Sequence, residues 1–241
     1  MERQEQICFL ERCRLRDEQL HCVNVLEDRV QPSLLGSVDA LLIGGAGEFS
    51  AWDDYPWMAP LLEFIRTAVA RDLPTFGSCW GHQVIARAFG GTVIHDLDRA
   101  ELGSGQVYLT EAGMDDPLFG SFPRAFYANM GHHDRVSVLP DQAVELAYSD
   151  TQRNQAYRFA EKPVYGTQFH SELDAARERE RLIAYRSYYK KEMPSEKDFQ
   201  AVIDNLVDTS EVDDLLYDFL RTYAVQAPVR TGAQAPEGDQ R

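Results

Sequence analysis

Short apolar runs alternate with helical patterns through the first half of the chain, and this alternation predicts a β/α arrangement. We expect strands at the apolar runs 7–10, 23–26, 40–43 and 74–76. Apolar residues recur at helical spacing over 57–69, and a second helix is expected over 81–89, before Gly90-Gly91. Buried strands alternating with helices are typical of a mainly parallel sheet covered on both faces.

In the second half, short strands separated by turn residues replace this alternation. They are expected at 107–109, 125–127, 136–138, 144–148 and 156–159, as an antiparallel extension of the sheet. A last strand over 164–169 ends at His170. Helices are expected at about 175–191, 196–207 and 211–223, with Ser195 and Ser210 as N-caps. The predicted fold class is an α/β three-layer sandwich with a mixed, mainly parallel central sheet and C-terminal helices.

The composition predicts how this fold is divided. With 241 residues and 44% hydrophobic content, the chain can bury a core without disulfide or metal staples. We expect a catalytic domain over 1–190 and a helical extension over 191–225 packed on it. Residues 226–241 are Gly, Pro, Gln, Ala and charged residues, which predicts a disordered tail.

The charge balance excludes several classes of partner. The formal net charge is −15, from 24 basic and 39 acidic residues, so nucleic acid and anionic membranes are poor partners. No apolar run approaches the roughly 18–20 residues that span a bilayer. The first residues lack the basic and apolar regions of a secretory signal. We therefore expect a cytoplasmic protein.

One of the four cysteines lies in a reactive context. Cys8, Cys13 and Cys22 show no zinc-site spacing, so neither a metal site nor a cofactor is expected. Cys79 lies in Gly77-Ser78-Cys79-Trp80-Gly81, between a predicted strand and a predicted helix. That context suits a nucleophile elbow, in which the helix N-terminus favours the thiolate and its N–H groups bind an oxyanion. The alternative is a buried structural cysteine in a glycine-rich turn.

Several segments in order resemble the class I glutamine amidotransferases. The segment Gly77 to Gln83 resembles their G-x-C-x-G-x-Q motif, and Gln168-Phe169-His170-Ser171-Glu172 resembles their Q-F-H-P-E strand end. Residues 42–46 resemble the loop after their third strand, and 132–136 resemble the H-G-D-x-V segment of the branch that includes the amidotransferase part of GMP synthase. The matches cover about residues 7–172 and imply the family's flavodoxin-like sandwich.

The resemblance implies a role for each matched residue. Cys79 would attack the amide carbon of glutamine to form a γ-glutamyl thioester, and His170 would transfer protons. Glu172 would orient His170. The family's oxyanion hole corresponds to the backbone N–H groups of Gly45 and Trp80. Substrate-binding positions correspond to Gln83, with His132 and His133 lining or supporting the pocket.

Three departures from the family pattern leave the substrate preference open. Ser171 and Ala46 stand where the family usually has proline, and His133 stands where glycine is common. No acceptor-domain motif accompanies the predicted glutaminase site, neither a pyrophosphatase loop nor a P-loop. Two enzymatic hypotheses follow: a glutaminase that supplies ammonia to a separate synthetase, or a stand-alone hydrolase of γ-glutamyl compounds. A catalytically silent binding module is the third hypothesis, and the intact Cys79, His170 and Glu172 argue against it.

Overall fold

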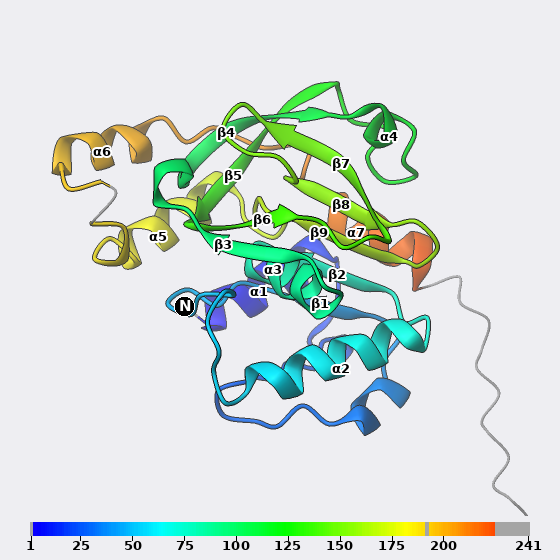
Figure 1. The fold of residues 1–241 in the computed structure, drawn as a ribbon. Helices are drawn as coiled ribbons and strands as arrows, with labels where there is room; N and C mark the ends of the chain where they lie inside the picture. The colour runs from blue at the N-terminus through cyan, green and yellow to red at the C-terminus, as the bar shows by residue number, and fades with distance from the viewer. Residues whose placement is uncertain (1, 191–192, 225–241) are drawn as a thin grey trace, which may run out of the picture.

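A seven-stranded mixed sheet forms the centre of the computed structural model, which describes residues 2–190 and 193–224 (Figure 1). In spatial order its strands are β1 (Leu41–Ile43), β2 (Thr75–Ser78), β9 (Val164–Thr167), β8 (Ala156–Phe159), β7 (Ala143–Ser149), β4 (Glu101–Leu109) and β5 (Ala125–His132). β1, β2 and β9 pair in parallel, and all the other pairs are antiparallel. The α/β class and the mixed sheet are confirmed, with a smaller parallel share than the apolar pattern predicts.

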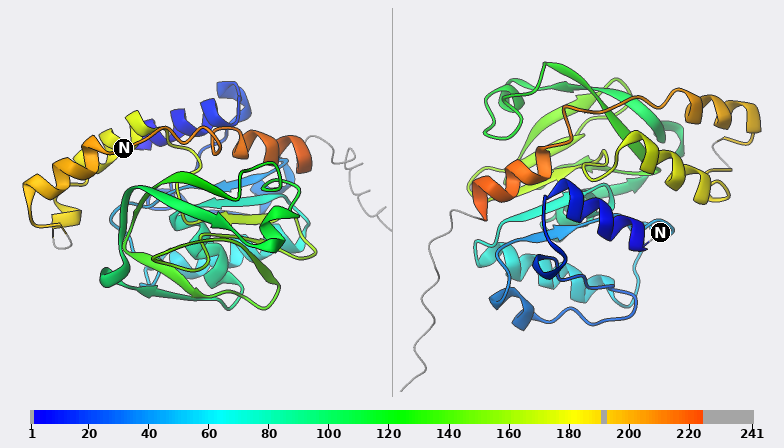
Figure 2. Two further views of the ribbon diagram at one scale, coloured as in Figure 1. Left: turned by 90° about the horizontal axis from the view of Figure 1, so that it is seen from above. Right: turned by 180° about the vertical axis from the view of Figure 1, so that it is seen from behind.

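Helices cover both faces of this sheet, so the protein has three layers (Figure 2). On one face lie α2 (Met58–Ala70) and α3 (Trp80–Ala88), whose apolar residues pack with Tyr157 and Val164 of the sheet. On the other face lie α1 (Glu2–Arg12), α5 (Ala175–Ala184), α6 (Glu196–Asp204) and α7 (Leu215–Tyr223). The remaining helices are short: α4 (Glu111–Met114), η1 (Asp17–Gln19), η2 (Pro32–Gly36), η3 (Leu97–Arg99) and η4 (Tyr188–Lys190).

Helix α7 is part of the main hydrophobic core. Phe219 is fully buried, and its ring lies 5.3 Å from that of Phe76 on β2. Val212, Leu215 and Leu216 belong to the same cluster of buried residues. The strand that leads to Cys79 is thus packed directly against a helix from the far end of the described chain.

Two N-terminal strand predictions are wrong. Residues 7–10 belong to helix α1, and residues 23–26 form no strand. A short apolar run does not distinguish a strand from a buried helical face, and here the flanking Glu, Gln and Arg residues are strong helix formers. Cys8 and Phe9 are buried on the inner face of α1, and Arg12 pairs with Asp213 at 2.7 Å.

Other differences concern pairing and helix ends. β6 (Asp134–Val138) does not extend the main sheet; it pairs with β3 (Thr92–His95), a strand that the pattern does not predict. The helix expected over 175–191 ends at Ala184. Ser195 caps α6 as predicted, accepting a hydrogen bond from the Asp198 N–H at 3.2 Å. The Ser210 prediction is wrong, because Asp214 precedes α7. The predicted tail over 226–241 lies outside the described residues.

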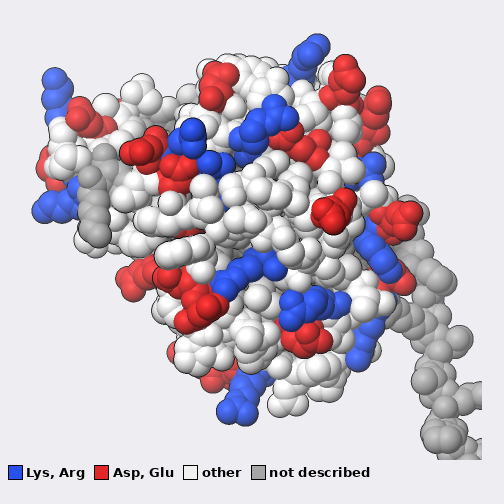
Figure 3. All heavy atoms as spheres, viewed as in Figure 1, with Lys and Arg blue, Asp and Glu red and all other residues white. Residues whose placement is uncertain are grey.

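The surface mixes charges of both signs. On the face shown in Figure 3, Lys and Arg side chains lie among Asp and Glu side chains. Among the described residues, no helix has the length and apolarity needed to cross a bilayer.

Candidate functional site

Cys79 lies in the sharp turn between β2 and α3. Its backbone angles are φ 52° and ψ −103°, a strained conformation for a residue with a side chain. The turn depends on the flanking glycines. A Cβ atom on Gly77 would lie 2.4 Å from the Gly81 carbonyl carbon, and one on Gly81 would lie 2.1 Å from the Ile43 carbonyl oxygen. This close packing holds the cysteine at the end of the strand and places it beside the loop that follows β1.

His170 follows β9, the strand adjacent to β2. Its backbone N–H donates to the Asn129 carbonyl at 2.8 Å, which fixes the strand end against β5. The imidazole Nδ1 lies 2.7 Å from Glu172 Oε1. Burial disfavours the charged ring, but interactions with Glu172 and Cys79 raise the pKa of His170 well above its usual value. The structure therefore brings together the three side chains that the sequence singles out.

The Glu172 carboxylate is fully buried and receives three polar contacts. Besides His170, Ser78 Oγ donates to Oε2 at 2.5 Å and the Arg181 guanidinium donates to Oε1 at 3.2 Å. Burial would raise the pKa of Glu172, but His170, Arg181 and Ser78 outweigh it and lower the pKa to about 2. Glu172 is therefore ionised at neutral pH and can hold the imidazole ring in one orientation.

The two backbone groups predicted for an oxyanion hole lie at different places around Cys79. Trp80 is the first residue of α3, so its N–H is one of the unpaired donors of a helix start. Gly45 lies in the loop after β1, and its N–H donates to the Glu5 carboxylate of α1 at 2.6 Å. Both residues line the same cavity as Cys79. Their binding of an oxyanion stays a prediction.

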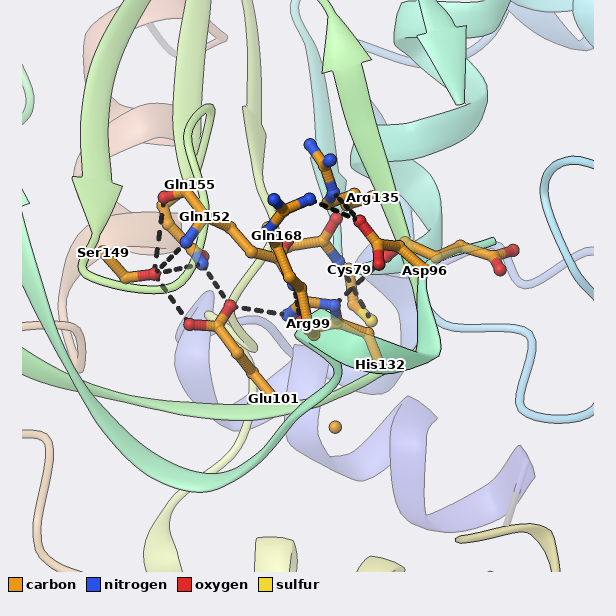
Figure 4. Close-up of polar contacts among 12 residues, drawn as sticks. Cys79, Asp96, Arg99, Glu101, His132, Arg135, Ser149, Gln152, Gln155 and Gln168 are labelled. Atoms are coloured by element: carbon orange, nitrogen blue, oxygen red, sulfur yellow. Dashed lines mark hydrogen bonds and ion pairs between the residues drawn. The ribbon is translucent and has the colours of Figure 1, made fainter. Parts of the chain in front are cut away.

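Gln83 links elements of the site. Its side-chain Nε2 donates to the Asp134 carbonyl at 2.8 Å and to Gln168 Oε1 at 3.1 Å. The Gln168 Nε2 atom in turn lies 3.9 Å from the Cys79 sulfur (Figure 4). Gln83 also lines the cavity, but both of these contacts are within the protein, so its contact with substrate remains a prediction.

The two neighbouring histidines have different surroundings. His132 is buried: Nδ1 lies 3.1 Å from the Asp134 carbonyl oxygen and Nε2 lies 3.3 Å from Glu101 Oε2. Figure 4 shows Glu101 in a polar network with Ser149 and Gln155. His133 stacks on Tyr188, with ring centroids 4.7 Å apart and 14° between the planes. Both line the cavity, and their role in lining or supporting the substrate pocket stays a prediction.

The cavity beside Cys79 has a volume of about 1000 Å³. It runs from Cys79 and His170 past Gly45 to the N-terminal segment around residues 20–26. That volume is at the upper end of the range for small-molecule sites. Within the described part of the chain, no group of three or more His, Cys, Asp or Glu side chains is arranged to hold a metal ion.

Three charged residues of the site were not expected from sequence. Glu5, Glu178 and Arg181 interact electrostatically with the triad positions, yet Glu178 and Arg181 lie in Arg177-Glu178-Arg179-Glu180-Arg181, which has the pattern of a solvated helix face. Glu178 and Arg181 are nevertheless buried. Glu5 lies two residues before the strand predicted over residues 7–10. A charge run carries no signal of burial, so tertiary packing alone reveals these residues.

Comparisons with known proteins match the sequence of this chain to one protein family. The sequence profile described as "Glutamine amidotransferase class-I" matches residues 12–187. A glutamine-hydrolyzing GMP synthase subunit from Methanococcus maripaludis is 40% identical over 106 residues, which are 44% of this chain and 54% of that protein. The chain thus spans about half the length of that curated relative. The corresponding subunit of Archaeoglobus fulgidus is 31% identical over 149 residues, 62% of this chain and 74% of that protein.

Solved structures agree on the fold. A glutamine amidotransferase from Thermotoga maritima superposes with a TM-score of 0.65 at 22% identity, covering 79% of this chain and 80% of that one. A glutamine amido transferase from Methylobacillus flagellatus gives a TM-score of 0.71 at 23% identity, covering 91% of this chain and 89% of that one. At these identities the likeness concerns the architecture.

Proposed function

This chain belongs to the class I glutamine amidotransferase family, and we propose that it hydrolyses the side-chain amide of glutamine to supply ammonia to a separate acceptor enzyme. The observation that carries the proposal is the strained Cys79 turn beside the buried His170–Glu172 pair. Nucleophile, base and orienting carboxylate in this order are the arrangement of covalent acyl transfer.

The reaction proceeds in two halves. The Cys79 sulfur attacks the amide carbon of glutamine while His170 holds the proton taken from the thiol, and the carbonyl oxygen becomes an oxyanion. When the tetrahedral species collapses, the C–N bond breaks and His170 gives its proton to the departing ammonia. A γ-glutamyl thioester remains on Cys79. Water, deprotonated by His170, then attacks this thioester and releases glutamate and the thiol.

The surrounding residues set the geometry of these steps. Glu172 holds Nδ1 of His170, which leaves Nε2 for the proton transfers. Gly45 and Trp80 would offer backbone N–H groups to the oxyanion, a contribution worth about 3 kcal/mol per donor in comparable sites. Gln83, His132 and His133 would bound the pocket for the rest of the substrate.

A separate acceptor is supported by the names of the relatives. Those from Methanococcus maripaludis and Archaeoglobus fulgidus are each named as one subunit of GMP synthase. The four cysteines are free thiols, which suits a reducing compartment and supports a cytoplasmic enzyme.

A second candidate is a hydrolase of γ-glutamyl peptides or conjugates, which the size of the cavity favours. A volume of about 1000 Å³ extends beyond the space that free glutamine needs. Both candidates use the same thioester, so they differ only in what occupies the far part of the cavity.

The test compares substrates on the purified chain. Ammonia or amine release is measured with glutamine and with γ-glutamyl peptides, in wild type and in Cys79→Ala. If kcat/KM for glutamine equals or exceeds kcat/KM for the γ-glutamyl peptides, the result supports the amidotransferase. If kcat/KM for a γ-glutamyl peptide is about a hundredfold higher than for glutamine, a difference of about 2.7 kcal/mol, the result selects the hydrolase. No release from any γ-glutamyl compound overturns both.

Covalent labelling checks the nucleophile independently. The glutamine analogue 6-diazo-5-oxo-norleucine is expected to label Cys79 alone. The other three cysteines are an internal control, because Cys8 and Cys13 are buried with pKa raised to about 12 and Cys22 is exposed but outside the turn. Peptide mapping that finds the adduct on any of these three rejects the assignment.

A further inference from the structure

A carboxylate of the protein itself lies in the proposed oxyanion site. Glu5 Oε1 accepts the Gly45 N–H at 2.6 Å, the bond that a substrate oxyanion would otherwise receive. The carboxylate lies directly against the loop: a Cβ atom on Gly44 would be only 2.1 Å from Glu5 Oε1. The absence of a side chain at Gly44 therefore makes room for the Glu5 side-chain oxygen at this point.

The guanidinium of Arg181, on helix α5, lies close to the same loop. A Cβ atom on Gly45 would lie 3.6 Å from Glu5 Oε1 and 3.8 Å from Arg181 Nη1. Arg181 is 8% exposed, and Nη1 contacts Glu172 at 3.2 Å. Its Nε and Nη2 atoms are buried and have no hydrogen-bond partner among the described residues. Glu172, Glu5 and Glu178 already balance the charge of this guanidinium, but its two unused donors can still donate hydrogen bonds to a further oxygen atom.

This position is adjacent to the nucleophile. Gly81, two residues after Cys79, packs so closely on Ile43 that the loop at Gly44 and Gly45 must lie beside the cysteine turn. Cys79, Gly45, Glu5 and Arg181 line one cavity. A negative charge forming on a substrate bonded to Cys79 would develop next to the Gly45 N–H and Arg181.

We propose that the Gly45 N–H and the Arg181 guanidinium form an anion seat that binds the substrate's developing negative charge, and that Glu5 is its internal occupant. Arg181 is then a substrate-binding residue, supplying a positive charge in addition to the backbone donors. Helix α1 competes with substrate for the seat, because the Glu5 carboxylate has the same chemical form as the γ-carboxylate of the product glutamate. The use of the seat in turnover rests on the proposed function.

The competition between Glu5 and substrate predicts what must move before substrate can occupy the anion seat. Substrate binding requires Glu5 to leave Gly45, so α1 must shift or its side chain must rotate. The helix is held at its other end by the ion pairs of Arg12 with Asp213 and of Glu11 with Arg177. Withdrawal of the single Glu5 side chain therefore opens the seat while these contacts remain.

The test uses alkylation of Cys79, which does not require glutamine hydrolysis. Iodoacetate carries a carboxylate into the site and iodoacetamide is its neutral counterpart, so the ratio of their rates at Cys79 measures the seat. Glu5→Ala removes the carboxylate that occupies the seat, and it is expected to raise the ratio of the iodoacetate rate to the iodoacetamide rate about tenfold. Glu11→Ala, which removes a carboxylate from the exposed part of the same helix, is the matched control and should leave the ratio within about twofold of wild type.

The role of Arg181 is separated by a double variant. Glu5→Ala/Arg181→Met is expected to lose the gain in the ratio, and Glu5→Ala/Arg181→Lys to retain part of it. Iodoacetamide alone reports any general damage to the nucleophile, so a structural effect on Glu172 does not alter the conclusion. An unchanged ratio in Glu5→Ala overturns the proposal, as does a gain that survives Arg181→Met.

Failure of the two proposals is distinguishable. If the ratio responds as expected but no γ-glutamyl compound is hydrolysed, the seat stands and the proposed function falls. If glutamine is hydrolysed, Glu5→Ala should also lower KM about tenfold with little change in kcat. If glutamine is hydrolysed but Glu5→Ala changes neither the ratio of alkylation rates nor KM, the anion seat is rejected and the proposed glutaminase function stands.

Discussion

The backbone N–H of Ser171 donates to Ser78 Oγ at 3.2 Å. This bond leaves the Ser78 hydroxyl proton for Glu172, to which it donates at 2.5 Å. Proline, the residue common at position 171 in the family, has no N–H and could not make the first contact. The departure at Ser171 therefore adds a support to the buried carboxylate that orients His170.

This relationship predicts coupled effects on turnover. Ser78→Ala should lower kcat about tenfold, because Glu172 loses a charge-assisted hydrogen bond of about 1.5–3 kcal/mol. Ser171→Pro should cost less, and the double variant should cost no more than Ser78→Ala alone. Steady-state kinetics of the four proteins gives the coupling. Additive losses would show that Ser171 acts independently of Ser78.

The orienting carboxylate gives a second kinetic prediction. Glu172→Gln should lower kcat by more than Ser78→Ala but by less than Cys79→Ala, which eliminates the thioester route. An amide can still contact His170, but it can no longer favour the charged imidazole. Single-turnover measurements should show slower thioester formation in Glu172→Gln. Wild-type rates in this variant would exclude Glu172 from the mechanism.

Backbone strain at Cys79 makes a prediction about stability. At φ 52° and ψ −103°, any residue with a Cβ is strained by about 1–3 kcal/mol, and glycine is not. Cys79→Gly should therefore unfold with a free energy about 1 kcal/mol higher than Cys79→Ala, after the entropy of glycine in the unfolded chain is included. Denaturant titration of the two inactive proteins measures this. Greater stability of the alanine variant would contradict the strain.

Glu178 predicts a pH dependence of stability. Burial raises its pKa to about 7 from the usual 4.5, despite the opposing effect of His170 and Arg181. The folded state thus binds the proton more tightly than the unfolded state, and stability falls as pH rises from about 4.5 through about 7. Glu178→Gln should remove this loss. Between pH 4.5 and pH 8 the free energy of unfolding of wild type should fall by about 3 kcal/mol more than that of the variant.

A matched control exists on the same helix. Glu180 is exposed, so Glu180→Gln should follow the wild-type dependence of unfolding free energy on pH. Parallel curves for Glu178→Gln and wild type would show that Glu178 does not titrate in this range.

The nucleophile turn and its partner residues could be predicted from the sequence, but most of the residues that surround them could not. The Cys79 and His170 motifs are local: glycines at fixed positions and a strand end have signatures that need no tertiary information. The charged residues around them have no such signature, because Arg181 and Glu178 are buried only through the packing of α5 on the rest of the protein. The strand predicted over residues 7–10 is wrong for a related reason. Four apolar residues fit a strand or a helical face equally well, and only the packing of Phe9 in the same core as α7 identifies the helix.

The packing of Phe219 against Phe76 has a consequence for how the protein is made. β2, which leads to Cys79, receives its neighbouring strand from residues 164–167 and part of its covering layer from residues 215–223. Such long sequence separations make this part of the fold slow to form. Until translation has passed α7, a nascent chain lacks the helix that packs on the Phe76 face of β2, so the core beneath the Cys79 turn is completed only after that helix has been synthesised.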